Sequence, residues 1–403
     1  MAVAQKINDG IDRLVRGERR FDPYVRPAFD RLFQRPLAAA TQTLIRARRP
    51  PEPIGLAEER IFDGEEQAVT AIVESMSAFL HRTYDGHGPA QRAGNTKTYG
   101  VVRGSFEVLA DMAPRLRRGL FAEPATYPVW VRFAGPGPLA PPDMQDNGVL
   151  SIGIKVMGVP GPKLLDERWT QDFTGISAPT FTTPNVFENV KLQCHIGDGT
   201  PVLYFLGPRD HHLLDGIMQG LYAKTQVNPL GERYWSCSSY LLGTGQAMHY
   251  SLRPRERLRT RFPRRPSDDY LREAMAATLR RRDVEFDFLV QVQTDAQRMP
   301  IEDDGVDWPE RLSPSIPVGR LRIPAQRFDS PGQLGLADSL SFNPWHCLEA
   351  HRPLGSQNRA RRTIYQRLSE LRQSMNGAAH VEPTGDETFD DHPIPPGPLT
   401  EEP

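Results

Sequence analysis

An arginine and a tyrosine occur near the C-terminal end of the chain at a spacing that could bind a metal ion. Arg361 and Tyr365 lie four residues apart in a stretch, 359–374, whose pattern predicts a helix. On a helix the two side chains share one face, so the guanidinium could hydrogen-bond the phenolic oxygen and favour its anionic form, a hard ligand suited to ferric iron. Arg372 lies two turns further along that face. Arginine and tyrosine also stack at this spacing on ordinary helix surfaces, so the spacing by itself leaves both interpretations open.

Other patterns that carry chemistry are weak in this sequence. His211 and His212 are adjacent, so a helix would point them in different directions, and the sequence has no HExxH pattern and no tight Cys/His cluster. The three cysteines, Cys194, Cys237 and Cys347, are far apart and form no CxxC pair, which argues against a disulfide framework or a structural zinc site. The sequence also lacks a nucleophile elbow and a phosphate-binding glycine loop.

The segment around the arginine and tyrosine pair resembles the proximal heme motif of the catalase superfamily. That motif is Arg-x-x-x-Tyr, with an arginine seven residues after the tyrosine and an asparagine four residues after that arginine. Its four positions are matched here by Arg361, Tyr365, Arg372 and Asn376. Four other segments resemble family strands or the approach to the proximal helix: 97–108 (KTYGVVRGSFEV), 127–133 (YPVWVRF), 318–323 (VGRLRI) and 342–344 (FNP). The likeness runs from about Arg92 to Asn376, and it is closest to the bacterial catalase-like heme proteins rather than to true catalases.

The resemblance implies that the chain binds heme b. Tyr365 would be the axial phenolate ligand of the iron, with Arg361 stabilising its anionic form. His346 and His351 flank the proximal helix, and imidazole also binds iron, so an axial histidine is the alternative. Because the planar guanidinium suits a carboxylate, the heme propionates would be held by the arginines at the family's matching positions. These are Arg92, Arg132 and Arg372.

The positions that face bound peroxide in catalases differ in this chain. The resemblance places Asn95 where catalases have the distal histidine, and a shifted alignment places Thr96 there. Neither side chain can accept and return a proton near neutral pH. The serine that supports the histidine is replaced by Ala134. The usual distal asparagine aligns with one of three residues: Ile176 by direct count, or Ser177 or Gly175 if one gap is allowed. Rapid dismutation of hydrogen peroxide is therefore expected to be impaired.

These features together predict a heme-dependent oxidoreductase with an altered distal pocket. An asparagine above the iron can still hydrogen-bond a bound peroxide or organic hydroperoxide, and loss of the bulkier network leaves space for a larger substrate. The expected activity is of the peroxidase, peroxygenase or hydroperoxide-rearranging type, with weak catalase activity. Asn95 and Thr96 are the candidate catalytic residues. The alternatives are a non-catalytic heme-binding protein and a cofactor-free scaffold that keeps the barrel for protein contacts.

The elements that must position these residues indicate an α+β fold. Period-two patterns bounded by glycine and proline predict strands at 101–108, 127–133, 148–157, 246–252, 286–293 and 319–323. Helical periodicity predicts helices at 64–80, 211–223, 268–282 and 359–374. Because the strands are irregularly spaced and lack βαβ alternation, the pattern favours an antiparallel sheet or barrel with helices at its periphery. The resemblance makes this a β-barrel of catalase type.

The chain is expected to divide into three parts. Residues 1–90 would form an N-terminal arm that begins with short amphipathic helices, and 91–376 would form the heme-binding barrel domain with its helices. Residues 377–403 are acidic and rich in proline, and a disordered tail is expected there. The arm could wrap a neighbouring subunit of a homo-oligomer, or it could pack on its own barrel.

Composition argues against several classes of protein. Lys and Arg number 49 against 50 Asp and Glu, so the chain lacks the overall cationic field of a nucleic-acid-binding protein. The arginine run between Arg253 and Arg265 either binds phosphates or is a solvated surface loop, and its lack of interleaved aromatic residues favours the loop. Apolar stretches fall short of the 18 or more residues that a membrane span needs. Without a recognisable secretory signal or cysteine framework, we expect a cytoplasmic protein that acts on a small-molecule peroxide or organic substrate.

Overall fold

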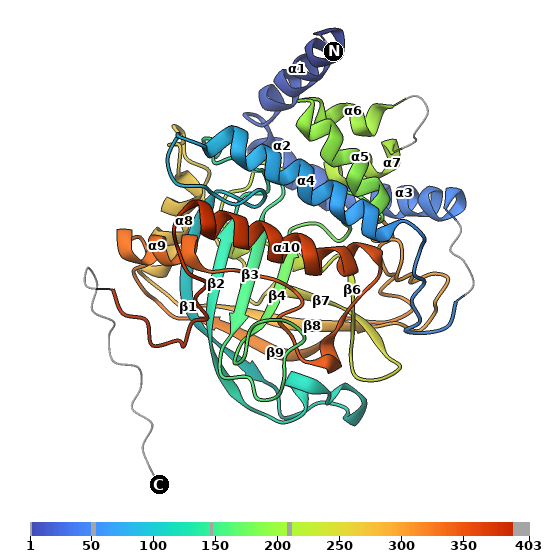
Figure 1. Ribbon diagram of the computed structural model, residues 1–403, viewed down its shortest axis with the longest axis vertical. Helices are drawn as coiled ribbons and strands as arrows, with labels where there is room; N and C mark the ends of the chain where they lie inside the picture. Colours follow the sequence, from blue (N-terminus) through green and yellow to red (C-terminus); the bar gives the residue numbers. More distant parts are fainter. Residues whose placement is uncertain (1, 50–53, 146–147, 208–211, 390–403) are drawn as a thin grey trace.

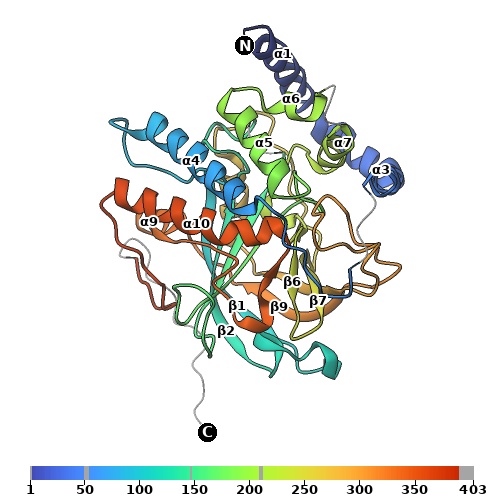
Figure 2. The same ribbon diagram turned by 45° about the vertical axis from the view of Figure 1, so that its right-hand side comes forward.

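The computed structural model describes residues 2–49, 54–145, 148–207 and 212–389 (Figure 1). An antiparallel β-barrel forms its centre, and helices gather across one side of the barrel and beyond one end (Figures 1 and 2). Within these residues, no helix is both long enough and apolar enough to cross a membrane.

Eight of the described strands close into a barrel in which every neighbouring pair is antiparallel. The pairing of the last of these strands with the first completes the ring. In order around the barrel they are β1 (Thr98–Val108), β2 (Thr126–Ala134), β3 (Ser151–Val156), β4 (Gln171–Ile176), β5 (Tyr234–Trp235), β7 (Ala247–Pro254), β8 (Val284–Val292) and β9 (Ile316–Ile323). Two short strands extend the edge of β7: β6 (Ser239–Leu241) and β10 (Pro353–Leu354). This barrel with its peripheral helices confirms the predicted α+β class.

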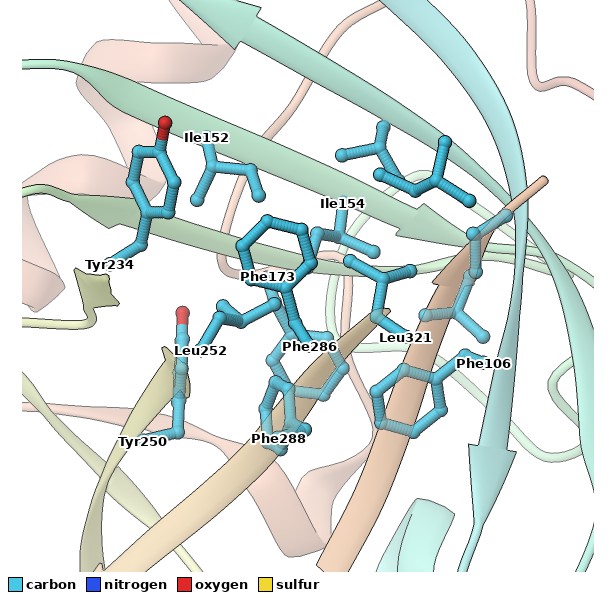
Figure 3. Close-up of a cluster of buried hydrophobic side chains, with 14 of the residues drawn as sticks. Phe106, Ile152, Ile154, Phe173, Tyr234, Tyr250, Leu252, Phe286, Phe288 and Leu321 are labelled. Carbon is cyan, nitrogen blue, oxygen red and sulfur yellow. The ribbon is translucent and has the colours of Figure 1, made fainter. Parts of the chain in front are cut away.

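The interior of the barrel is filled with side chains. Because successive residues of a strand point to opposite faces, Val131 belongs to the buried core while its neighbour Arg132 points outward. Aromatic rings occupy the centre, where the Phe173 ring centroid lies 4.9 Å from that of Phe288 and 5.2 Å from that of Tyr250 (Figure 3). A barrel packed in this way encloses no channel, so a functional site has to lie outside it.

Helices cover the outer face of the barrel. α10 (Ser356–Met375) runs across β2, β3 and β4 in Figure 1 and packs through Ala360 and Ile364 on α4 (Glu65–Tyr84) and α5 (Val186–Gly197). The segment before α10 lies directly on the sheet, because a side chain added at Gly153 of β3 would come within 2.9 Å of the Phe342 ring. α10 and its approach therefore face the outward side chains of the sheet.

The N-terminal helices pack on the same chain at their C-terminal end. Arg49, which follows α3, forms a bidentate ion pair with Asp215 of α7 at 2.8 and 2.9 Å. α1 contacts α6, and α3 packs on α7. The remaining helices are α1 (Ala2–Glu18), α2 (Asp22–Phe29), a π-helical segment (Asp30–Gln34), α3 (Arg35–Arg48), α6 (Pro201–Leu206), α7 (Leu213–Tyr222), α8 (Tyr270–Leu279) and α9 (Pro331–Ser339), together with short 3-10 turns.

The six predicted strands correspond to β1, β2, β3, β7, β8 and β9, and the predicted helices at 64–80, 211–223, 268–282 and 359–374 correspond to α4, α7, α8 and α10. β4 was not predicted, because its polar residues Gln171 and Asp172 are buried by partners elsewhere in the chain. β5 has only two residues, too few to give a periodic pattern. The division of the chain into three parts stays a prediction.

Part of the expected disordered tail is ordered against the barrel. The Trp130 indole N–H donates to Glu387 Oε2 at 2.7 Å, and Glu382 accepts from the main-chain N–H groups of Arg168, Trp169 and Thr170. These two carboxylates anchor the stretch 381–389, whose sequence has too few apolar residues to indicate a packed segment. Residues 390–403 lie outside the described residues.

Candidate functional site

The arginine and tyrosine pair lies on the face of α10 that turns toward the barrel. Arg361 is buried, and its guanidinium carbon lies 5.9 Å from the centre of the Tyr365 ring and 4.8 Å from that of Phe181. The expected hydrogen bond to the phenolic oxygen is not among the described contacts. Instead, Arg361 Nη1 donates to Ser238 Oγ at 3.0 Å and to Asn358 Oδ1 at 2.9 Å. The pair is therefore in contact, but the guanidinium is fixed by other groups.

The charge on Arg361 is stabilised although the side chain is buried. Burial by itself would lower the pKa of the guanidinium. The pKa is nevertheless raised, because Tyr365, then Tyr240 and Asp304, together have a larger effect than burial. Arg361 is thus a permanent cation beside the Tyr365 ring. The Arg361 Nε atom has no hydrogen-bond partner within the described chain.

The hydroxyl group of Tyr365 is also without a protein partner. The ring is partly buried and packs against the apolar cluster shared by α4, α5 and α10. Among the residues that the structure describes, none hydrogen-bonds its phenolic oxygen. This oxygen is therefore the best available donor for a metal ion on this face of α10.

Three buried or partly buried arginines converge from separate elements. Arg132 comes from β2, Arg92 from the segment before β1, and Arg372 from the last turn of α10. Arg132 Nη2 donates to the main-chain oxygens of Asn95 at 2.8 Å and Thr96 at 3.0 Å. Arg92 and Arg372 both donate to the main-chain oxygen of Leu340. In the described part of the chain, none of the three forms an ion pair with a carboxylate.

The three guanidinium groups repel one another. Burial, followed by the charges of the other two arginines, lowers the pKa of Arg92 well below its usual value. Burial is also the main reason why the pKa of Arg132 falls to about 10 and that of Arg372 falls; Asp338 offsets part of the effect. Such a cluster is stabilised by an anion, and paired carboxylates match the planar guanidinium geometry best.

The barrel presents a row of uncharged residues beside this cluster. Thr98, Ala134, Ser151 and Ile176 stand opposite one another across β1 to β4, so they share the outer face. The only side-chain hydrogen bond described within this row runs from Ser151 Oγ to the Ala134 oxygen, at 3.2 Å. The described row contains no group that exchanges a proton near neutral pH.

The structure distinguishes the three candidates for the distal asparagine position. Ile176 lies in the outward row. Gly175 pairs with Ile152 of the inner core, and a side chain added to it would meet the Trp235 oxygen at 2.9 Å. Ser177 is buried and accepts from the Leu150 N–H at 2.9 Å. Only Ile176 therefore faces the same side as Ala134.

Asn95 is held close to the arginine cluster by its main chain. It has a φ of 50°, a left-handed conformation that asparagine tolerates better than most residues. Its carbonyl oxygen accepts from Arg132, and Thr96 Oγ1 donates to the Arg92 oxygen at 2.6 Å. The two candidate catalytic residues are thus next to the predicted anion-binding arginines.

Neither alternative histidine is free to bind a metal. His346 Nδ1 lies 2.8 Å from Asp172 Oδ2, and its Nε2 lies 2.9 Å from Asp166 Oδ1. His351 Nε2 accepts from the Leu120 N–H at 2.9 Å, and burial lowers the pKa of His351 to about 4. No group of His, Cys, Asp or Glu that could hold a metal ion occurs in the described ranges. An axial histidine is therefore disfavoured by the geometry.

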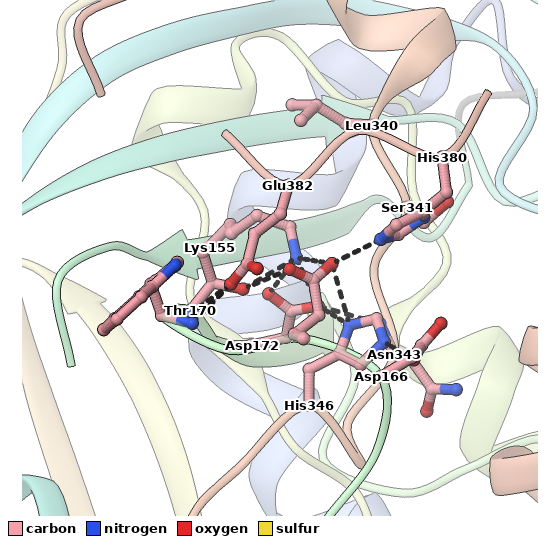
Figure 4. Close-up of polar contacts among 12 residues, drawn as sticks. Lys155, Asp166, Thr170, Asp172, Leu340, Ser341, Asn343, His346, His380 and Glu382 are labelled. Carbon is pink, nitrogen blue, oxygen red and sulfur yellow. Dashed lines mark hydrogen bonds and ion pairs between the residues drawn. The ribbon is translucent and has the colours of Figure 1, made fainter. Parts of the chain in front are cut away.

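A buried ionic network behind the site fixes the approach to α10. The Lys155 ammonium lies 2.9 Å from Asp172 Oδ1 and 3.1 Å from Glu167 Oε1, and all three side chains are fully buried. Asp172 Oδ2 also accepts from the main-chain N–H of Asn343 at 2.9 Å and contacts His346 (Figure 4). The network ties β3 and β4 to the segment that precedes α10, so the sheet and the helix keep a fixed relation.

Sequence reasoning missed the residues that support Arg361. Phe181, Ser238 and Asn358 contact it, and Asp304 adds a nearby negative charge. Three of these four lie in loops without periodicity. Asn358 lies in the first turn of α10. The sequence could have indicated it only through its position three residues before Arg361 on the same helix.

Comparison with known proteins identifies the fold. No family model and no curated protein sequence matches the chain. Solved structures do match, among them a bacterial catalase (TM-score 0.55, 14% identity, 88% of this chain and 71% of that chain covered), catalase A from Saccharomyces cerevisiae (0.58, 13%, 88% and 74%) and a fungal catalase (0.55, 14%, 88% and 72%). The chain therefore has the catalase fold. At these identities the likeness establishes the fold alone.

Proposed function

We propose that this chain is a heme-dependent oxidoreductase that acts on a peroxide or an organic hydroperoxide and has weak catalase activity. The observation that carries the proposal is the cluster formed by Arg92, Arg132 and Arg372, which has no carboxylate partner among the described residues. It lies on the same side of the barrel as Tyr365, whose oxygen is without a described partner. The catalase fold supports the same assignment.

The residues present fit heme b. The group has two propionate carboxylates, which would neutralise the arginine cluster, and a ferric iron, for which a phenolate is a suitable ligand. Arg92, Arg132 and Arg372 would hold the propionates, and Tyr365 would bind the iron. When bound, the heme supplies the redox chemistry that peroxide oxidation requires.

The residues around the proposed ligand have separate tasks. Arg361 supplies a fixed positive charge beside the Tyr365 ring. Ser238 and Asn358 hold that guanidinium in place, since each accepts a hydrogen bond from Nη1. The Phe181 ring packs on the guanidinium. Together they would fix the position of the Arg361 charge beside the proposed ligand.

The distal residues suit hydrogen bonding rather than proton relay. The Asn95 amide can donate to or accept from a peroxide, and the Thr96 hydroxyl, which donates to the Arg92 oxygen, can only accept. Neither can carry a proton from one oxygen to the other near neutral pH. The neighbouring row adds Ala134 and Ile176, which are apolar. We therefore expect organic hydroperoxides to be better substrates than hydrogen peroxide.

A second candidate is a non-catalytic heme-binding protein. The observation that favours it is the same row of Thr98, Ala134, Ser151 and Ile176, which lacks a proton-accepting group. Binding would then depend on the arginine cluster and Tyr365 as before, while turnover would be absent.

Two assays on the full chain separate these candidates. Hemin titration followed by a pyridine hemochrome assay measures binding, and oxidation of a chromogenic donor with cumene hydroperoxide or hydrogen peroxide measures turnover. The proposal expects stoichiometric heme and faster turnover with cumene hydroperoxide. Bound heme without turnover on either oxidant would favour the non-catalytic protein, and failure to bind hemin would contradict both.

A further inference from the structure

The N-terminal arm exposes an unusual amount of apolar surface. We define the arm here as residues 2–49, which include α1, α2, the π-helical segment and α3. Leu14, Phe21 and Tyr24 are 76, 69 and 70% exposed. About half of the large apolar side chains that are exposed in the described chain belong to this arm: Ile7, Leu14, Phe21, Tyr24, Val25, Leu32, Phe33, Leu37 and Leu44. Single exposed apolar residues need no explanation, but a group of this size marks an interaction surface.

The exposed residues of the second half of the arm form a stripe beside the packed face. Ala38 and Ile45 of α3 are buried in the contact with α7. Phe33, Leu37 and Leu44 follow one another at intervals of four and seven residues, so they lie along one side of the helix and are exposed. The helix thus uses one face to attach to the protein and leaves a second apolar strip facing outward.

The arm is also strongly basic. Residues 1–49 contain eleven Lys and Arg against five Asp and Glu, a surplus of six positive charges in a chain whose net charge is −1. Arg20, Arg31, Arg35 and Arg48 are exposed. Basic side chains next to exposed aromatic and aliphatic ones are the composition of helices that lie in the interface of a membrane.

A second basic segment lies close to the arm. This arginine loop, residues 257–265, has five exposed arginines that form no ion pair among the residues described: Arg257, Arg259, Arg261, Arg264 and Arg265. One short segment contacts both structures. The Arg26 guanidinium of α2 donates to the Ala223 oxygen at 2.9 Å, and five residues further on Asn228 Nδ2 donates to Thr260 Oγ1 of the loop at 3.1 Å. The loop and the arm are therefore neighbours.

We propose that the arm and the arginine loop together dock on a membrane surface that contains anionic lipid. The apolar strip would enter the boundary between headgroups and acyl chains, and the arginines would bind the lipid phosphates. Charge complementarity selects this occupant. Two arms packed on each other would bring like charges together, and a nucleic acid would leave the apolar strip in water. The body of a second copy is the remaining occupant, and the light-scattering measurement below tests it. The proposal is independent of the proposed heme chemistry.

The test is co-sedimentation of the full chain with vesicles. Phosphatidylcholine vesicles are compared with vesicles of phosphatidylcholine and phosphatidylglycerol at three to one, at low and at high salt. We expect binding to the anionic vesicles, little binding to the neutral ones, and a loss of affinity as salt rises. No sedimentation with anionic vesicles at low salt would overturn the proposal.

Two pairs of variants locate the surface. Phe21→Ser with Tyr24→Ser removes apolar side chains, and Arg259→Gln with Arg261→Gln removes charge; each pair should weaken vesicle affinity at least about tenfold. The matched controls are Trp169→Ser, an exposed aromatic outside the arm, and Arg115→Gln with Arg168→Gln, two exposed arginines outside the loop. The controls should bind like the unchanged chain, and circular dichroism checks that each variant folds.

Other occupants give different results, each of which would overturn the proposal. If the Phe21 and Tyr24 pair converts an oligomer to monomers in light scattering without changing vesicle binding, the exposed apolar surface of the arm is an interface between copies. If only the arginine pair weakens vesicle binding, and single-stranded DNA competes fully with vesicles, the loop binds polyanions without the arm. Should the apolar pair fail to fold, the arginine pair alone still decides, because unchanged vesicle affinity in that variant contradicts docking.

Discussion

At the residue scale, Arg92, Arg132 and Arg372 are stabilised poorly by the protein itself. Each donates to main-chain oxygens, which satisfies hydrogen bonds but does not neutralise charge. Burial lowers the pKa values of all three, and the charges of neighbouring arginines add to this effect at Arg92 and Arg132. A ligand with two carboxylates would neutralise these charges. Loss of one arginine should therefore weaken ligand binding, while the stability of the ligand-free chain should stay the same or rise.

Replacement of Arg92 tests this opposition. In Arg92→Gln the amide can still donate to a main-chain oxygen, while the repulsion on Arg132 and Arg372 is relieved. We expect the melting temperature of the heme-free chain to stay the same or rise. The affinity for hemin should fall roughly tenfold to hundredfold, since a charge-assisted hydrogen bond contributes about 1.5–3 kcal/mol. Differential scanning fluorimetry and hemin titration measure the two effects.

Arg359 of α10 is the matched control. It is an arginine with carboxylate partners, 2.6 Å from Glu65, 2.7 Å from Glu59 and 3.1 Å from Glu302. Arg359→Gln should lower the melting temperature and leave hemin affinity unchanged. A similar loss of stability in both variants would contradict the assignment of the three-arginine cluster as an anion site.

The distal residues give a gain-of-function prediction. The resemblance places the catalase histidine and serine at positions 95 and 134, so Asn95→His combined with Ala134→Ser restores the base and the hydroxyl. Histidine also tolerates the left-handed backbone of residue 95. Dismutation of hydrogen peroxide, followed with an oxygen electrode, should rise by about a hundredfold or more, the usual contribution of a general acid–base group. No increase in a variant that retains its heme would show that the alignment of Asn95 is wrong.

Spacing and resemblance revealed different parts of the site. The spacing of Arg361, Tyr365 and Arg372 on one helix was readable from the sequence, because helical periodicity fixes which residues share a face. Arg92 and Arg132 are distant in sequence and were proposed only through the family resemblance. Phe181 and Ser238 lie in loops, and their contact with Arg361 depends on how the chain closes on itself. Tertiary contacts of this kind leave no periodic signal.

At the element scale, the loop 302–308 holds the end of the arm. Gln42 of α3 donates to the Gly305 oxygen and accepts from the Asp307 N–H, both at 3.0 Å, and Arg49 lies 3.0 Å from Asp303. Burial raises the pKa of Asp303 to about 6 and that of Asp307 to about 7. The loop therefore binds protons more tightly in the folded chain than in the unfolded one.

The raised pKa of Asp307 predicts how stability depends on pH. Between about pH 4 and pH 7 the folded chain keeps a proton on this carboxyl that the unfolded chain has lost, so stability falls as pH rises through that range. Asp307→Asn should therefore stabilise the chain at pH 8, by roughly 1–3 kcal/mol, and have little effect at pH 4. Thermal melts over this range measure the effect, with the exposed Asp111→Asn as control. Equal effects at both pH values would contradict it.

The same scale shows why only some strands were predicted. β8 alternates apolar and polar residues over most of its length, and β1 does so toward its end, so period two can be read there. β4 buries both of its faces, one in the barrel core and the other under the approach to α10, and the outward Asp172 is polar because it pairs with Lys155. A strand buried by an ionic network has no alternating pattern to detect.

At the scale of the whole molecule, the barrel is a solid support and the site lies between its outer face and α10. The aromatic core of Phe106, Phe173 and Phe288 fixes the strands, and the strands fix Arg132 and Ile176 on the outside. Closure of the barrel could not be predicted from the sequence, since it depends on pairing between β1 and β9, about two hundred residues apart. The catalase fold was predicted because the resemblance supplied that topology.

The absorption spectrum of heme-supplemented full-length protein, compared with that of Tyr365→Phe, tests the central claim most directly. The control is Tyr84→Phe, a partly buried tyrosine at the end of α4. The proposed function predicts about one heme per chain with a high-spin ferric spectrum, retained in the control and lost or strongly altered in Tyr365→Phe. Unchanged heme content and an unchanged spectrum in Tyr365→Phe would contradict it.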